Sequence, residues 1–259
     1  MEALLSFVCA ASPLPTLLSD TLTGPVDCSF LLYHFLGCAV PAAVASTPPA
    51  TAASSPQSAS LIVTCRVPSH HRALLRKCLG PARSEYVSLV CVHEVSRRLA
   101  ASCSSASPAS PEALAGALLG ACSGGSGVAH SLWLAVEDVQ GLCEAAGGVE
   151  QGFAVLQHLA AARPRGFLVR AEGACDWVLD GGCAGLLVAP TLGLALQRWA
   201  HTVVTGSDLP SGFSRDAHGK IEVWRKAGGG PSQPELGGLS ALFKVSPDGA
   251  VTDPSAGLL

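Results

Sequence analysis

The chain has 259 residues, of which 49% are apolar and only 14% are charged, and its formal net charge is −3. This length suits one large α/β domain or two small ones, and a domain of this size buries roughly three-quarters of its unfolded surface without help from a metal or disulfide. The slightly negative charge excludes the strongly basic overall field that marks many nucleic-acid-binding proteins.

The cysteines and the apolar runs indicate where the protein resides. The 11 cysteines are odd in number, form no Cys-x-x-Cys pair and lie mostly inside apolar runs. Buried free cysteine behaves as a small hydrophobic residue, so we expect a reducing compartment and no zinc site. The N-terminus lacks the basic start of a secretory signal, and no run approaches the ~20 apolar residues of a membrane span. We therefore predict a cytosolic or nuclear protein without membrane association.

Apolar strand and helix patterns alternate along the chain. They predict strands at 16–19, 61–65, 86–92, 132–136, 166–170 and 201–205. They also predict helices at 29–39, 73–79 and 112–122, helical structure that ends at 162, and a helix that ends near 198. Low-complexity stretches at about 40–60 and 100–127 are interpreted as surface insertions, because they bury too little to offset their ordering entropy. Since the strands are apolar on both faces, the pattern predicts an α/β fold with a mostly parallel sheet flanked by helices.

The segment from Leu209 to Arg225 predicts an antiparallel C-terminal hairpin at one edge of this sheet. Asp216 occupies the position at which a type I turn takes a side-chain acceptor, and Gly219 occupies a position at which the chain needs a positive φ. The residues that follow alternate between polar and apolar types, which is the period of a half-buried strand.

One face of the strand after this turn carries an unusual set of side chains. Lys220, Glu222 and Trp224 share that face. A tryptophan beside two charged residues indicates a surface that contacts something other than water. Trp224 is interpreted either as an anchor at a subunit contact or as core beneath the C-terminal segment around Phe243.

The turn after the first strand is where phosphate binds in folds of this type. Here it contains Gly24, Asp27 and Ser29, and no Lys or Arg precedes Arg66. A phosphate loop requires a lysine for the β/γ-phosphates. We therefore expect a degenerate phosphate loop without a cofactor, in which Asp27 is the N-cap of the next helix.

The buried strand at 132–136 ends in Glu137 and Asp138, the place of the magnesium-associated acid in phosphate-loop ATPases. Beside the degenerate loop, these acids suggest an ATPase fold that has lost its site. No nucleophile elbow, zinc-protease motif or dinucleotide fingerprint occurs. His70 and His71 lack companions at ligand spacing and are interpreted as surface or core residues. The sequence thus predicts no catalytic residue and no metal site.

Three segments occur together in one order: Asp27–Leu36, the strand ending in Glu137 and Asp138, and Gly212–Arg225 followed by Pro231–Pro234. Together they resemble the sixth subunit of the Elongator complex. The resemblance implies a single RecA-like, KaiC-like domain over residues 1–259 without ATP-binding motifs. The chain departs from the family at Cys28, where the family has glycine, and at Ala217, where it has valine.

The resemblance also implies partners. They are the fourth and fifth Elongator subunits, which share the fold and complete a six-membered ring, and, indirectly, the catalytic Elongator subcomplex. The assembled ring binds tRNA and supports the addition of carboxymethyl-type groups to its wobble uridine. The implied interface residues belong to the hairpin: Phe213, Arg215, Asp216, His218, Gly219 and Trp224.

Contacts with RNA are assigned to a local basic cluster. Arg72, Arg76 and Lys77 are the candidates, together with Arg215, and a solvated helix face is the alternative for the first three. Two other functions stay open. One is a RecA-like ATPase in which Arg215 reaches across an interface towards Glu137 and Asp138, unless it pairs with Asp216 or with a neighbour's carboxylate. The other is a RecA-like scaffold or chaperone outside Elongator.

Overall fold

The computed structural model describes residues 14–20, 29–40, 59–64, 67–102, 110–122, 132–172, 190–209, 217–226, 239–245 and 251–252. The strands are β1 (Pro15–Asp20), β2 (Ala59–Val63), β3 (Val87–Cys91), β4 (Trp133–Val136), β5 (Gly166–Glu172), β6 (Thr202–Ser207), β7 (Gly219–Arg225), β8 (Leu239–Val245) and β9 (Val251–Thr252). The helices are α2 (Ser29–Ala39), α3 (Pro68–Leu79), α4 (Pro81–Ser84), α5 (Val92–Ser102), α6 (Pro111–Cys122), α7 (Val139–Ala146), α8 (Val149–Ala161) and α10 (Pro190–Trp199).

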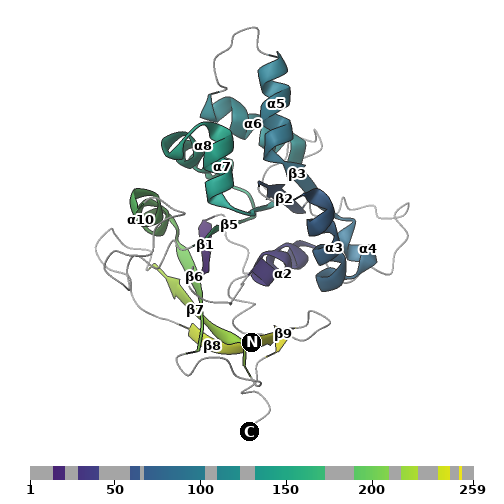
Figure 1. Ribbon diagram of the computed structural model, residues 1–259, viewed down its shortest axis with the longest axis vertical. Helices are drawn as coiled ribbons and strands as arrows, with labels where there is room; N and C mark the ends of the chain where they lie inside the picture. Colours follow the sequence, from purple (N-terminus) through teal and green to yellow (C-terminus); the bar gives the residue numbers. More distant parts are fainter. Residues whose placement is uncertain are drawn as a thin grey trace.

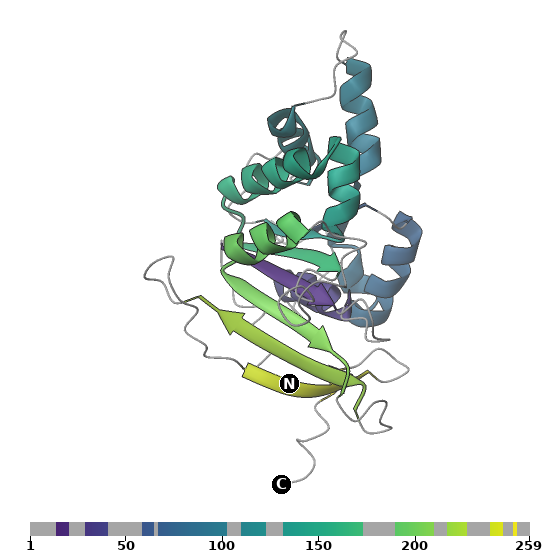
Figure 2. The ribbon, with the colours of Figure 1, turned by 60° about the vertical axis from the view of Figure 1, so that its left-hand side comes forward.

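The described strands form a mixed sheet in the spatial order β3-β2-β4-β5-β1-β6-β7-β8-β9. From β3 to β6 all neighbours are parallel, whereas β7, β8 and β9 continue the sheet with antiparallel pairings. Figure 2 shows β7 and β8 extending away from helices α5 to α8. The predicted α/β fold, with a mostly parallel sheet and an antiparallel hairpin at one edge, is confirmed.

Helices cover both faces of the parallel strands (Figure 1). Successive residues of a strand point to opposite faces. Leu17 of β1 therefore belongs to the core cluster that includes residues of α6, α7, α8 and α10, whereas Leu18 belongs to the cluster that includes residues of α2 and α3. In β2, Ile62 lies on the same face as Leu17 and Leu61 on the same face as Leu18. All four side chains are fully buried. This two-sided burial is the reason that the central strands read as continuous apolar runs.

Some elements differ from the sequence-based expectation. Helix α5 was not predicted, although Val92 and Val95 form an apolar stripe at helical spacing. Strands β8 and β9 were also not predicted, because pairing with β7 rather than local propensity sets β8. Ala59 and Ser60, assigned to a surface insertion, instead form the buried start of β2.

Buried cysteines are part of the core, as the sequence indicated. Cys122 and Cys143 are free thiols buried in the cluster between the sheet and helices α6 to α8. Burial raises the pKa of the Cys122 thiol to about 12 and that of the Cys143 thiol to about 11. Both therefore pack as neutral thiols at neutral pH. Within the described ranges, no helix has the length and apolarity needed to cross a bilayer.

Helices α7 and α8 approach each other so closely that only glycine fits at position 152. A Cβ atom on Gly152 would lie 2.6 Å from the Cα atom of Cys143, whereas one on Gly116 of α6 would have no atom within 4 Å. We expect Gly152→Ala to lower the free energy of unfolding by about 1–3 kcal/mol through overpacking. The control Gly116→Ala should raise it by about 0.5–1 kcal/mol through helix propensity. Urea unfolding measures both, and equal effects would contradict the packing.

Candidate functional site

The candidate site lies where the parallel strands β1, β2 and β4 end and helices α2, α3 and α7 begin. Ligands bind at the carboxyl ends of the strands in open α/β sheets. Ser29, the first residue of α2, is buried. Gly24 and Asp27 lie outside the described residues, so the N-cap role of Asp27 stays a prediction.

Glu137 directly follows β4, and its side chain is turned into the protein, where the residue is only 3% exposed. Its Oε2 atom accepts a hydrogen bond from the backbone N–H of Thr64 at 2.9 Å, and its Oε1 atom lies 2.9 Å from Nε2 of His71. A carboxylate buried without partners would cost several kcal/mol. The backbone amide and the imidazole therefore compensate Glu137 from within the chain.

His71 is the centre of this arrangement and is itself fully buried. Its Nε2 atom stands at ion-pair distance from Glu137, without a hydrogen bond of regular geometry to any described residue. Its Nδ1 atom lies 3.0 Å from the hydroxyl oxygen of Tyr33 on α2, which is also buried. We call Tyr33, His71, Glu137 and the amide of Thr64 the buried polar network.

Asp138, the second acid of the pair, has a different structural role from Glu137. It is the N-cap of α7, with φ −153° and ψ 126°. Its carboxylate accepts hydrogen bonds from the backbone N–H groups of Gln140 at 3.1 Å and Gly141 at 2.9 Å. An aspartate at this position satisfies amides that have no partner within the helix, so its oxygens are directed at α7.

The residues at this edge do not fit a magnesium–nucleotide. Glu137 is held by His71 and Thr64, Asp138 caps a helix, and no lysine or arginine precedes Arg66 to neutralise phosphates. Among the described residues, no three His, Cys, Asp or Glu side chains converge as a metal site requires. Among the described residues, both acids after β4 are therefore occupied by contacts within the chain.

Sequence reasoning missed the pairing of His71 with Glu137. It interpreted His70 and His71 alike as surface or core residues, and the structure places His70 on the surface and His71 in the core. The helical period could have indicated that His71 is buried, because His71 and Leu75 stand four residues apart on the buried face of α3. The partner acid lies too far along the chain for any spacing rule to find.

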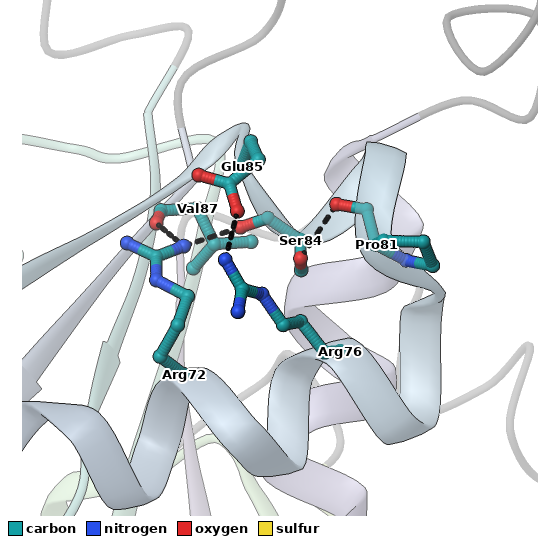
Figure 3. Close-up of polar contacts among 6 residues, drawn as sticks. All are labelled: Arg72, Arg76, Pro81, Ser84, Glu85 and Val87. Carbon is teal, nitrogen blue, oxygen red and sulfur yellow. Dashed lines mark hydrogen bonds and ion pairs between the residues drawn. The ribbon is translucent and has the colours of Figure 1, made fainter.

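The basic cluster on α3 is only partly available to a ligand (Figure 3). Arg72 donates hydrogen bonds to the carbonyl oxygens of Ser84 and Val87, which fixes the connection between α4 and β3. Arg76 pairs with Glu85 at 3.0 Å, and both side chains are 58% exposed. Lys77 is exposed on the same helix. The contact of these three residues with RNA stays a prediction.

A further arginine of this region also serves the fold. The guanidinium of Arg83 donates hydrogen bonds to the carbonyl oxygens of Gly37 and Val40, at the C-terminal end of α2. Carbonyl groups at this end have no partner within the helix, and a cation there interacts favourably with the negative end of the helix dipole. Burial and the nearby positive charge of Arg83 lower the pKa of His34.

The predicted hairpin alternation is confirmed. Ile221 and Val223 of β7 are fully buried, whereas Lys220, Glu222 and Trp224 are partly exposed on the other face. Strand β7 pairs with β6 in an antiparallel register that places Trp224 opposite Val203 and Lys220 opposite Ser207. Phe213, Arg215 and Asp216 lie outside the described residues.

One detail of the hairpin prediction is wrong, and Trp224 lies on the opposite face of β7 from the one that meets Phe243. Gly219 is not a positive-φ turn residue: it opens β7 and is paired with Phe243 of β8. Phe243 packs against Phe30 of α2, with ring centroids 5.2 Å apart, on the same face as Ile221. Trp224 points to the opposite face, so it does not form core around Phe243. His218 donates its backbone N–H to the Phe243 carbonyl oxygen at 2.7 Å.

Comparisons with known proteins identify the fold class of the chain. No protein-family model and no curated protein sequence matches the chain. Among solved structures, it is similar to a KaiC-like protein from the hyperthermophilic archaeon Pyrococcus horikoshii, with a TM-score of 0.53 and 8% sequence identity. The match covers 93% of this chain and 89% of the other. The chain therefore has a RecA/KaiC-like α/β fold.

The capping role of Asp138 gives a direct test of how that acid is used. We expect Asp138→Ala to lower the free energy of unfolding by about 0.5–2 kcal/mol, because two amides of α7 lose their acceptor. The control Asp138→Asn should be nearly neutral, since an asparagine oxygen caps a helix as well as an aspartate oxygen does. Urea unfolding measures both. Equal losses would show that the negative charge, rather than the cap, is what matters.

Proposed function

We propose that this chain is a non-catalytic structural subunit of a RecA-like ring, corresponding to the sixth subunit of the Elongator complex. In this role it joins the fourth and fifth subunits, and the ring binds tRNA and supports modification of the wobble uridine. The observation that carries the non-catalytic part is the internal use of both acids, Glu137 and Asp138, in a chain without a phosphate-binding lysine.

Access to the buried groups, as well as their chemistry, supports the proposal that the chain is non-catalytic. The network contains a hydroxyl, an imidazole and a carboxylate in contact, which is the order of groups in a nucleophilic triad. However, Tyr33 is 2% exposed and His71 is not exposed at all. A substrate would have to reach the hydroxyl oxygen of Tyr33 to within hydrogen-bond distance, and burial prevents this. The groups are therefore assigned to folding rather than to chemistry.

The antiparallel extension supports the assembly role. Lys220, Glu222 and Trp224 share the face of β7 turned away from Phe30 and α2, and the first two form an ion pair. A tryptophan on a partly exposed face can supply a large apolar contact at low entropic cost, as is typical of interface anchors. The same hairpin carries the resemblance to the Elongator family. We therefore propose that this face contacts a neighbouring ring subunit.

Assembly tests the proposal through two tryptophans with different surroundings. Co-expression with fourth- and fifth-subunit relatives should give one hexameric species by native mass spectrometry. We expect Trp224→Ala to weaken the ring at least about 30-fold, which corresponds to about 2 kcal/mol. The control Trp199→Ala should instead lower the stability of the chain, because Trp199 packs against Phe153 and Phe167 in the core.

Failure of the chain to co-purify with these relatives would contradict the proposal. An intact ring with Trp224→Ala and a less stable chain would show instead that Trp224 stabilises only its own sheet. ATP turnover by the ring that is lost on Glu137→Gln would support the alternative, an ATPase with an unconventional site. Normal assembly without tRNA binding would favour a scaffold outside Elongator.

Binding of tRNA by the ring provides a separate test of the basic cluster. We expect Lys77→Gln to weaken binding and to reduce the slope of log affinity against log salt by about 1, as loss of one phosphate contact does. Arg72→Gln should chiefly lower stability, because its guanidinium holds the Ser84 and Val87 carbonyls. Mobility-shift titrations at several salt concentrations measure this. An unchanged slope for Lys77→Gln would remove Lys77 from the interface.

A further inference from the structure

The buried polar network joins four elements at the carboxyl edge of the sheet. Tyr33 comes from α2, His71 from α3, Thr64 from the end of β2 and Glu137 from the end of β4. The backbone adds one more bond here, because the N–H of Glu137 donates to the carbonyl oxygen of Ile62 at 3.0 Å. Phosphate-loop proteins use the same edge to hold nucleotide and magnesium.

We propose that this network is an internal latch that takes the structural place of a bound magnesium–nucleotide. It fastens α2 and α3 to the ends of β2 and β4 through three side chains and the backbone amide of Thr64. In a phosphate-loop protein, the acid after this strand is compensated by a cation and its water shell. Here the imidazole of His71 stands beside the carboxylate of Glu137, at 2.9 Å.

The hydrogen-bonding capacity of the groups fits one continuous arrangement. The carboxylate of Glu137 only accepts, so the His71 tautomer that suits it carries the proton on Nε2. Nδ1 is then an acceptor, and the hydroxyl of Tyr33, 3.0 Å away, donates to it. The second oxygen of Glu137 accepts the N–H of Thr64. The hydrogen bonds from Tyr33 to His71 and from Thr64 to Glu137, together with the close contact of His71 Nε2 with Glu137 at 2.9 Å, connect α2 through α3 to both strand ends.

The apolar packing around the latch explains why its directional contacts matter for the positions of α2 and α3. Apolar side chains of α2 and α3 pack on the same face of the sheet, and a Cβ on Gly37 of α2 would lie 2.5 Å from Cδ2 of Leu79 on α3. Apolar packing is non-directional, so it leaves the sliding of these helices along the sheet weakly restrained. A directional network at the helix N-termini fixes that position. This role requires no partner subunit and does not depend on the proposed assembly.

Hydrogen exchange of the full chain, read by mass spectrometry, tests the latch helix by helix. Tyr33→Phe removes only the hydroxyl, and we expect amide exchange in α2 and α3 to become about tenfold faster, as loss of one buried hydrogen bond predicts, while exchange in α8 is unchanged. The matched control is Ser60→Ala, which removes another buried hydroxyl bond, from Ser60 Oγ to the Cys122 carbonyl oxygen at 3.2 Å. It should leave α2 and α3 as they are.

A rescue experiment tests whether the imidazole itself is required. His71→Ala should increase exchange in α2 and α3 more than Tyr33→Phe does, and added imidazole should restore part of the protection. In the unaltered chain, magnesium with ATP should change neither exchange nor the melting temperature. Equal acceleration in all helices with Tyr33→Phe, or protection of α2 and α3 by magnesium with ATP, would overturn the latch. If His71→Ala does not fold, the comparison of Tyr33→Phe with Ser60→Ala decides alone.

Discussion

The compensation of one buried carboxylate is the constraint around which the carboxyl edge of this sheet is organised. Glu137 follows a strand buried on both faces, and its side chain has almost no access to water. A buried carboxylate left without a compensating partner costs several kcal/mol. The chain meets this requirement with the backbone N–H of Thr64, the residue after β2, and with His71 of α3.

The carboxyl edge of the sheet and its antiparallel extension differ in the contacts that their polar side chains make. At the carboxyl edge, the acids after β4 serve the fold, and arginines of α3 and α4 hold backbone carbonyls of neighbouring segments. At the far edge, β7 and β8 extend the sheet beyond helices α5 to α8, with one face packed against α2 and the other partly exposed. The chain thus shares the layered fold of a KaiC-like protein to which it is 8% identical. A shared fold does not determine function, which depends on the residues of individual sites.

Several elements were predictable because their local pattern and their tertiary environment agree. Helix α2 was placed at its observed bounds by a continuous apolar run, and β4 by apolar residues on both faces. The same reasoning did not predict strand β8, because the position of β8 depends on its pairing with β7. The segment that connects the two strands has no hydrophobic pattern that would indicate this pairing. Gly219 was assigned to a turn for its residue type, yet the backbone there is extended because it pairs with Phe243.

The sequence by itself determined the fold class, the place of the hairpin and the lack of a phosphate-binding lysine, because periodicity and residue type are local properties. It also located Glu137 and Asp138 at the end of a buried strand. Only the tertiary structure decided how each acid is used. Asp138 finds its partners within the next turn of chain, whereas Glu137 meets His71 because parallel pairing of β2 with β4 brings distant segments to one edge. Contacts of that kind depend on which strands are neighbours, and no spacing along the chain encodes them.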